Sequence, residues 1–130
     1  MGYDLIGDIH GHSEPLVELL KKLGYLRSNG VFRQADRKVI FLGDFIDKGP
    51  NQRDVIEIVR PMIEAGTALS VMGNHEFNAI AWFIEDPENP GQYLREHTKR
   101  HQGQHQAFLD AYAGADDYAD LIEWFRTLPM

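Results

Sequence analysis

Three short apolar segments each run through a glycine into a carboxylate or an amide, and this recurrence constrains the fold more than any other feature. The apolar runs extend from Tyr3 to Ile6, from Val39 to Leu42 and from Ala68 to Met72. Their length and composition are typical of strands that are covered on both faces. The residues that follow are Gly7-Asp8, Gly43-Asp44 and Gly73-Asn74. We therefore predict three strands that end in polar, ligand-type side chains.

A helix is predicted in the gap between the first and second strands. Its apolar residues recur at helical spacing at Leu16, Leu19, Leu20 and Leu23. Ser13 is expected to cap this helix and Gly24 to end it. The segment Ser28-Asn29-Gly30 then predicts a tight hairpin turn before the second strand.

A second helix is predicted between the second and third strands. Its apolar stripe consists of Val55, Ile58, Val59, Met62 and Ile63. Pro61 has no backbone N–H to donate, so we expect it to kink or divide this helix, and Gly66 to end it.

The order of these elements predicts an α/β fold built from consecutive right-handed βαβ units. The sheet is expected to be parallel, and the carboxyl ends of its strands then share one edge, where open α/β sheets bind ligands. Asp8, Asp44 and Asn74 should therefore meet in space.

The chain after Asn74 is predicted to be helical. Phe77, Ile80, Ala81 and Ile84 share one face of the first of these helices. We interpret residues 1–130 as part of a single domain, with a metal-binding βαβαβα core in residues 1–84 and a helical cap segment in residues 85–130.

Composition narrows the functional classes. The chain contains no Cys, which excludes disulfides and thiolate metal sites, and its net charge of −7 disfavours nucleic acid as a partner. No long apolar run and no signal-peptide pattern occur, so we expect a soluble cytoplasmic protein without a membrane partner.

The strand ends offer ligands for divalent metal ions. Strand alternation places Asp8 and His10 on one side while Ile9 turns away. Together with Asp44 and Asn74 they form a mixed oxygen and nitrogen set that suits Mn²⁺, Fe or Zn²⁺. Two ions that share Asp44 could hold a bridging hydroxide for in-line attack on a phosphorus atom.

Three further residues are candidates for catalysis. His75 follows Asn74 directly and is placed to protonate a leaving oxygen, with Asp47 holding its imidazole. Lys48 offers a positive charge to a substrate phosphate. Each motif alone could equally be a turn or a capped helix start, and only their combination favours the functional reading.

The three blocks resemble those of a known family. Gly7-Asp8-Ile9-His10-Gly11, Gly43-Asp44-Phe45-Ile46-Asp47-Lys48-Gly49 and Gly73-Asn74-His75-Glu76 are similar to the first three signature blocks of the calcineurin-like metallophosphoesterases. The resemblance is closest to the phosphoprotein phosphatase branch, which includes Ser/Thr protein phosphatases and bacterial symmetrical diadenosine tetraphosphatases.

The resemblance implies a set of roles. Asp8, His10 and Asp44 would bind a first metal ion, while Asp44 and Asn74 would hold a second, with manganese expected first and Fe, Zn, Ni or Co as alternatives. His75 would be the general acid paired with Asp47. The family usually has Arg where this chain has Lys48. A guanidinium that could bind phosphate through two hydrogen bonds is then replaced by a single ammonium group.

The resemblance also implies a two-sheet sandwich, of which this chain would be the N-terminal portion. Family members complete the second metal site with two later histidines, and the chain stops at Leu128-Pro129-Met130, about where the next strand would begin. The expected function is hydrolysis of phosphomonoesters or nucleotide phosphoanhydrides, with a phosphorylated small molecule, a nucleotide or a phosphoprotein as substrate. The alternative is a truncated, catalytically incomplete metal-binding or interaction module.

The remaining histidines and tryptophans have weaker signals. His97, His101 and His105 follow helical spacing, and we interpret them as part of an exposed cap helix in preference to a metal site. His12 is expected to face substrate or support a ligand. The Trp82-Phe83 and Trp124-Phe125 pairs are expected in the core.

Overall fold

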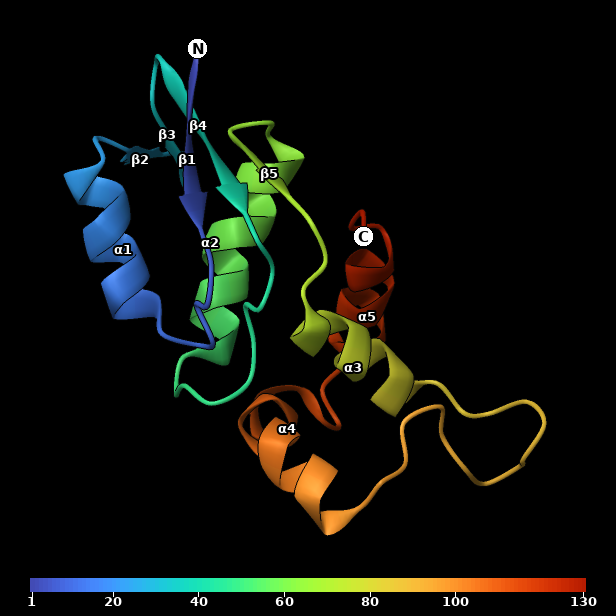
Figure 1. The fold of residues 1–130 in the computed structure, drawn as a ribbon. Coiled ribbons are helices and arrows are strands. Elements are labelled where there is room, and N and C mark those ends of the chain that lie inside the picture. Colours follow the sequence, from blue (N-terminus) through green and yellow to red (C-terminus); the bar gives the residue numbers. More distant parts are fainter.

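A parallel sheet forms one part of the molecule. The computed structural model describes residues 1–130 and contains five strands and five helices. Strands β1 (Gly2–Ile6), β4 (Arg37–Phe41) and β5 (Ala68–Ser70) pair in the order β1-β4-β5, and both pairings are parallel. The predicted α/β class and parallel sheet are confirmed, and all three strands end at the same edge (Figure 1).

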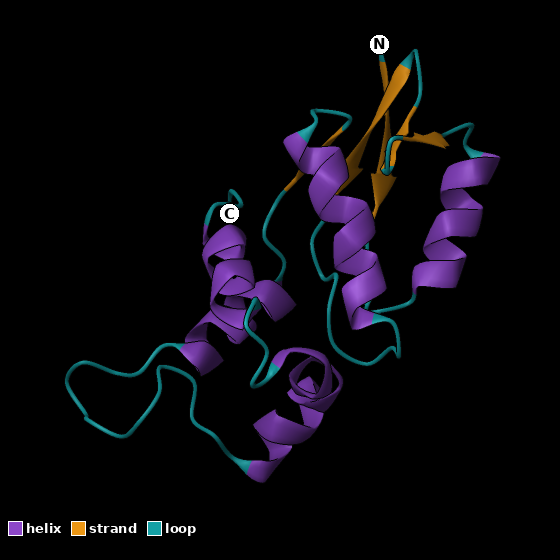
Figure 2. Cartoon of the chain, turned by 180° about the vertical axis from the view of Figure 1, so that it is seen from behind, coloured by secondary structure: helices purple, strands orange, loops and turns teal.

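The two crossover helices cover the same face of this sheet. Helix α1 (Ser13–Lys22) follows β1 and helix α2 (Gln52–Glu64) follows β4. Both lie on one side of the strands (Figure 2), as right-handed crossovers that advance in the same direction along a sheet require. This arrangement leaves the carboxyl edge of the sheet open for the loops that follow each strand.

The ends of α1 agree with the sequence only in part. Gly24 has φ +91° and follows the last turn, so the predicted stop is confirmed. The prediction that Ser13 caps the helix is wrong, because His12 occupies the cap position and Ser13 is already helical. The left-handed turn at Gly11, with φ +72°, leads the chain directly into the helix and brings its start forward.

Pro61 does not divide α2, which runs without interruption to Glu64. Proline leaves one carbonyl without its helical donor, that of Glu57, and Glu57 is exposed so that water can satisfy it. Gly66, with φ +78°, ends the helical segment as predicted.

The predicted hairpin is present. Strands β2 (Leu26–Ser28) and β3 (Val31–Arg33) pair antiparallel. The two residues between them, Asn29 and Gly30, have φ +51° and +79°, which is the conformation of a type I′ turn.

The prediction that the strands are covered on both faces is wrong. The covered face buries Ile6, Val39 and Phe41, whereas the opposite face leaves Leu5 66% and Leu69 52% exposed. No element of these 130 residues packs on that face (Figures 1 and 2). The apolar residues on the second face of these strands are therefore exposed to solvent in this chain.

Three further helices complete the chain: α3 (Asn74–Phe83), α4 (Lys99–Tyr112) and α5 (Tyr118–Arg126). The face predicted for α3 is wrong in part, because Phe77 is 51% exposed and Glu76, Ala79 and Trp82 are buried instead. The buried carboxylate of Glu76 sets the rotation of this helix. None of the five helices has the length and apolar character that a membrane crossing needs.

Helices α4 and α5 pack into the same core as the sheet. One cluster of 24 buried residues includes Phe108, Tyr112 and Phe125 together with Phe41 and Phe45. The predicted placement of both Trp-Phe pairs in the core is confirmed, since Trp82 and Trp124 are buried and Phe83 packs against the cluster.

A cation anchors α4 to α2. The guanidinium carbon of Arg53 in α2 lies 4.3 Å from the centroid of the Tyr112 ring, and Arg53 forms two hydrogen bonds of 2.8 and 3.1 Å to the carboxylate of Asp117. Planar guanidinium groups combine stacking and bidentate pairing in this way. The contact holds α4 next to the loop after β4.

We predict that Phe108→Ala lowers the free energy of unfolding by about 3–5 kcal/mol, because it opens a cavity in this core. Phe77→Ala removes the same ring from an exposed site of the neighbouring helix and should change the free energy by no more than about 0.5 kcal/mol. Urea unfolding of the two variants checks both values. Equal losses would contradict the assignment of α4 to the core.

Candidate metal and catalytic site

The predicted ligands Asp8, His10 and Asp44 are brought together at the carboxyl edge. One ligand atom from each of the three side chains can be chosen so that all lie within 4.8 Å of one another. Asp8 and His10 come from the loop after β1 and Asp44 from the loop after β4. Asn74 is the first residue of α3, directly after the β5 segment, and it is exposed at the same edge.

The loops that carry these residues have an unusual backbone. Asp8, His10, Asp44, Asp47 and Lys48 all have φ between +43° and +72°. This left-handed region is uncommon for residues other than glycine, and each such residue costs on the order of 1–3 kcal/mol unless its surroundings hold it. Strain of this kind clusters at functional sites. The observed geometry therefore supports a functional role for both loops.

Hydrogen bonds between the loops hold this geometry. The backbone N–H of His10 donates to the carbonyl of Asp44 at 2.9 Å, and that of Gly11 donates to Phe45 at 2.7 Å. The N–H of Gly49 in turn donates to the carbonyl of His10 at 2.8 Å. The two loops are thus joined backbone to backbone.

Glu76 joins the β4 loop to the β5 loop. Its fully buried carboxylate accepts hydrogen bonds from the backbone N–H groups of Asp44 (2.6 Å), Phe45 (2.9 Å) and Gly73 (3.1 Å). Burial raises the pKa of Glu76, and these three donors oppose part of the rise. We did not assign a role to Glu76 from the sequence, although its position within the third block was a usable signal.

Gly43 and Gly73 allow the same two loops to approach. A Cβ atom on Gly43 would overlap the backbone of Gly73, and one on Gly73 would overlap the backbone and carboxylate of Asp44. Asp44 also accepts a hydrogen bond from the backbone N–H of His75 at 3.1 Å. Only glycine fits where the backbones come this close.

Contacts on both ring nitrogens orient His10. Its Nδ1 lies 3.0 Å from the carbonyl oxygen of Ile46. A carbonyl can only accept, so Nδ1 carries the proton and Nε2 keeps its lone pair. Nε2 faces Asp8, 3.6 Å from its Oδ1. A neutral imidazole nitrogen beside two carboxylates, with its other nitrogen fixed by a carbonyl, fits a divalent cation.

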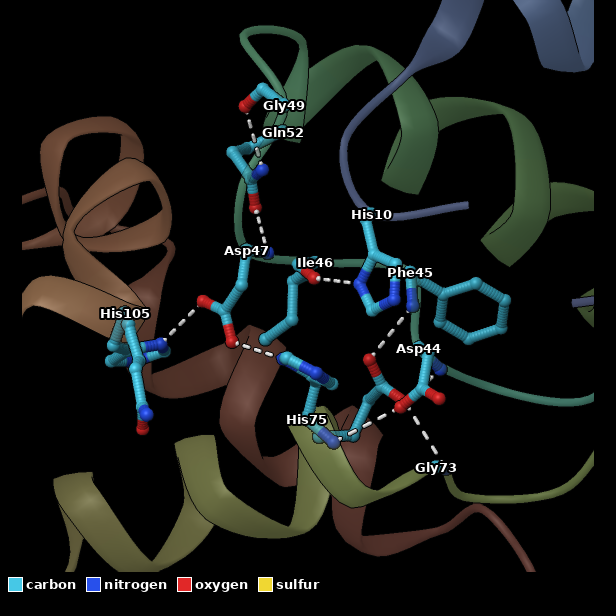
Figure 3. A network of polar contacts seen from close by, with 12 residues as sticks. His10, Asp44, Phe45, Ile46, Asp47, Gly49, Gln52, Gly73, His75 and His105 are labelled. Carbon is cyan, nitrogen blue, oxygen red and sulfur yellow. Dashed lines mark hydrogen bonds and ion pairs between the residues drawn. The ribbon is translucent and has the colours of Figure 1, made fainter. Parts of the chain in front are cut away.

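Asp47 lies between two histidines. Its Oδ2 is 2.7 Å from Nδ1 of His75, and its Oδ1 is 2.7 Å from Nδ1 of His105 (Figure 3). The Asp47 side chain is only 5% exposed, whereas that of His75 is 26% exposed. Asp47 thus fixes the orientation of His75 and leaves its ring accessible.

A glutamine secures the backbone beneath this contact. The N–H of Asp47 donates to Oε1 of Gln52 at 2.9 Å, and Nε2 of Gln52 donates to the carbonyl of Gly49 at 2.9 Å (Figure 3). Gln52 is buried at the start of α2. It closes the β4 loop on itself and fixes the carboxylate of Asp47.

The interpretation of His105 as part of an exposed cap helix is wrong. His105 is 5% exposed, and its ring stacks on Phe108 with centroids 4.7 Å apart. The spacing of His105, Phe108 and Tyr112 is that of one helical face, and this signal could have placed His105 in the interior. His97 precedes α4 and stacks on Trp82 at 3.6 Å, so the three histidines share no face.

The two remaining candidates are exposed. Lys48 follows Asp47 and lines a cavity together with His75. His12 lines a different cavity of about 220 Å³ beside Gly7 and Asp8. Its role in supporting a ligand or facing substrate stays a prediction.

The chain matches the calcineurin-like phosphoesterase family over residues 2–130. Proteins named bis(5'-nucleosyl)-tetraphosphatase PrpE [asymmetrical] are also similar. Those of Halalkalibacterium halodurans and Bacillus subtilis are each 42% identical over 76 residues, which cover 58% of this chain and 31% of each relative. The one from Geobacillus sp. is 43% identical over 85 residues, which cover 65% of this chain and 35% of the relative. The chain thus spans about a third of the length of these relatives.

We predict that Glu76→Gln lowers the free energy of unfolding by about 1–3 kcal/mol. The amide replaces one acceptor oxygen by a donor that faces backbone N–H groups, which leaves buried donors unsatisfied. Urea unfolding measures the loss. Glu18→Gln, the same change at an exposed position of α1, is the control, and its free energy of unfolding should differ little from that of the unmodified chain. A Glu76→Gln variant as stable as the control would contradict this role.

Proposed function

The chain belongs to the calcineurin-like phosphoesterase family, and from this premise we propose that it forms the N-terminal part of a metal-dependent hydrolase of phosphomonoesters or nucleotide phosphoanhydrides. One observation carries the proposal. Ligand atoms of Asp8, His10 and Asp44 lie within 4.8 Å of one another, next to a histidine that a buried aspartate holds in place. The names of the similar tetraphosphatases favour a nucleotide substrate.

The metal ligands are assigned within this proposal. Asp8, His10 and Asp44 would hold one divalent ion, and Asp44 with Asn74 would contribute to a second. The donor set of carboxylates, imidazole and amide oxygen suits Mn²⁺, with Fe, Zn, Ni or Co as alternatives. When bound, such ions supply Lewis acidity to phosphate oxygens and lower the pKa of water.

His75 is assigned as the general acid. Its Nδ1 donates to Asp47, which directs Nε2 away from the carboxylate. The ring lies edge-on to His10, with centroids 4.5 Å apart, so it stands beside the ligand cluster. From there Nε2 can give a proton to the oxygen that leaves phosphorus. Lys48 would place one positive charge on a substrate phosphate.

A second candidate function is a metal-binding or interaction module without turnover. It is favoured by the ligand count, because in these 130 residues only Asp44 and Asn74 are assigned to the second ion. Two measurements separate the candidates: the number of Mn²⁺ ions bound per chain, and hydrolysis of p-nitrophenyl phosphate in Mn²⁺. One bound ion without turnover would favour the module.

We predict that Asp44→Asn abolishes Mn²⁺ binding and hydrolysis together, because Asp44 is assigned to both ions and loses its charge. Calorimetric titration with Mn²⁺ and a phosphatase assay measure the two effects. Asp36→Asn makes the same change at an exposed bend and should leave both unchanged. Binding of Mn²⁺ by Asp44→Asn with unaltered affinity would remove Asp44 from the ligand set.

We predict that His75→Asn retains Mn²⁺ binding but lowers kcat by roughly 10²–10⁴-fold, the typical contribution of a general acid. The substrate must be an alkyl phosphate, because a leaving group as good as p-nitrophenolate needs little protonation. His101→Asn, the same change at a half-buried position in the first turn of α4, where the imidazole bonds to the carbonyl of Glu96, is the control. An unchanged kcat for the alkyl phosphate in His75→Asn would exclude His75 as the acid.

A further inference from the structure

A polar cavity lies beside His75, and none of the proposed metal ligands lines it. Its volume is about 290 Å³ and no hydrophobic residue lines it, which is near the lower end of the size range of small-molecule sites. Its wall combines residues of the β4 loop (Asp47 and Lys48), α3 (His75 and Asn78), the segment before α4 (Arg95) and α4 itself (Gln104 and His105). Four separate segments thus build one polar surface.

The cavity presents positive charge that the protein does not neutralise. Neither Lys48 nor Arg95 forms an ion pair, because the ion pairs of the molecule involve other residues. The side chain of Arg95 bonds only to a neutral partner, Oε1 of Gln104 at 3.1 Å. In a chain with a net charge of −7, two unpaired cations that face one cavity are the signature of an anion site.

The wall carries two cations, Lys48 and Arg95, against a single carboxylate, that of Asp47. Both oxygens of Asp47 accept hydrogen bonds, from His75 and from His105. His105 adds a second observation, because its buried Nε2 has no hydrogen-bond partner. Buried polar atoms without partners are uncommon, and because Nδ1 of His105 donates to Asp47, a hydroxyl group or water molecule that donates to Nε2 would complete its hydrogen bonding.

The position of the cavity defines what it would bind. His75 is shared between the cavity and the proposed metal cluster, and it is the residue assigned to protonate the leaving oxygen. A cavity that His75 borders is therefore next to the groups attached to that oxygen. A cationic surface at this place suits a leaving group that is itself a phosphate, and it gives no advantage to a neutral alcohol.

We propose that this cavity is an anion subsite for the leaving phosphate of a phosphoanhydride, with Arg95 as the residue that selects polyphosphate chains over simple phosphomonoesters. The inference rests on the proposed function and narrows its substrate class to nucleoside or inorganic polyphosphates. The roles proposed above for the residues around the attacked phosphate stay the same. What Arg95 adds is a contact to the next phosphate in the chain.

The reaction balances with water as the only co-substrate. A bond forms between the water oxygen and the attacked phosphorus, and the anhydride P–O bond breaks with its electron pair on the leaving phosphate oxygen. His75 gives its proton to that oxygen, and the proton that water loses passes through solvent and restores His75. Lys48 and Arg95 stabilise the charge on the leaving phosphate without changing their own protonation.

Binding of inorganic tripolyphosphate tests the subsite without turnover. The full chain is titrated by calorimetry in EDTA, so that metal ions cannot mediate the contact. We expect Arg95→Ala to weaken binding by roughly tenfold or more, the effect of losing one charge-assisted contact. Arg33→Ala, which removes the same charge from the exposed last position of strand β3, should change the affinity less than about twofold.

Two further measurements keep the test decisive. Arg95→Lys preserves the charge and should restore most of the affinity, which separates a lost cation from a distorted fold. In Mn²⁺, Arg95→Ala should lower kcat/KM for tripolyphosphate and leave kcat/KM for p-nitrophenyl phosphate unchanged. Equal affinities of Arg95→Ala and Arg33→Ala, or no binding of tripolyphosphate at all, would overturn the subsite.

The two proposals can fail independently. Absence of Mn²⁺ binding and of all hydrolysis would overturn the proposed function, while selective loss of tripolyphosphate affinity in Arg95→Ala would still establish the anion subsite. Hydrolysis of p-nitrophenyl phosphate with no effect of Arg95→Ala on tripolyphosphate would overturn the subsite alone.

Discussion

The buried carboxylate of Glu76 is the constraint on which the rest of the site depends. It accepts three backbone hydrogen bonds, from Asp44, Phe45 and Gly73, and so it joins the loops that follow two neighbouring strands. Burying an ionised carboxylate is costly unless hydrogen bonds compensate for lost water. Because these donors come from the backbone of the loops that follow β4 and β5, the compensation exists only when both loops have the observed conformation.

This constraint explains why strained residues can persist next to one another. Asp44 and Asp47 both have positive φ, and isolated loops would relax from that region. Glu76 holds the first of them, whereas Gln52 and the two histidines hold the second. The same carboxylate sets the rotation of α3, which directs His75 toward the cluster and leaves Phe77 in solvent. Local strain and helix orientation thus have one common cause.

The sequence was sufficient to predict the parallel sheet and insufficient to predict the contacts between distant segments, such as that of Asp47 with His105. Apolar runs that lead into Asp8, Asp44 and Asn74 predicted the parallel sheet and the approach of Asp8 and Asp44 at its edge, because side-chain period and βα spacing are local properties. The partner of Asp47 in α4 lies 58 residues away, and no local pattern encodes such a contact. The exposed face of the sheet was missed for a related reason, since a continuous apolar run shows that both faces of a strand can be buried and not that this chain buries both.

Asp47 connects the cluster of Asp8, His10 and Asp44 to the cationic cavity, because it holds His75, which borders both. Its two oxygens are held by histidines from different helices, His75 in α3 and His105 in α4. The Arg53 contacts that anchor α4 to α2 therefore also hold His105, whereas the backbone N–H of Arg95 donates to the carbonyl of Ala81 in α3 at 2.9 Å. The helices after the third strand thus place the residue assigned to acid catalysis at the wall of the proposed leaving-group subsite. A phosphate chain that spans both would meet a surface already arranged for it, which reduces the ordering cost of binding.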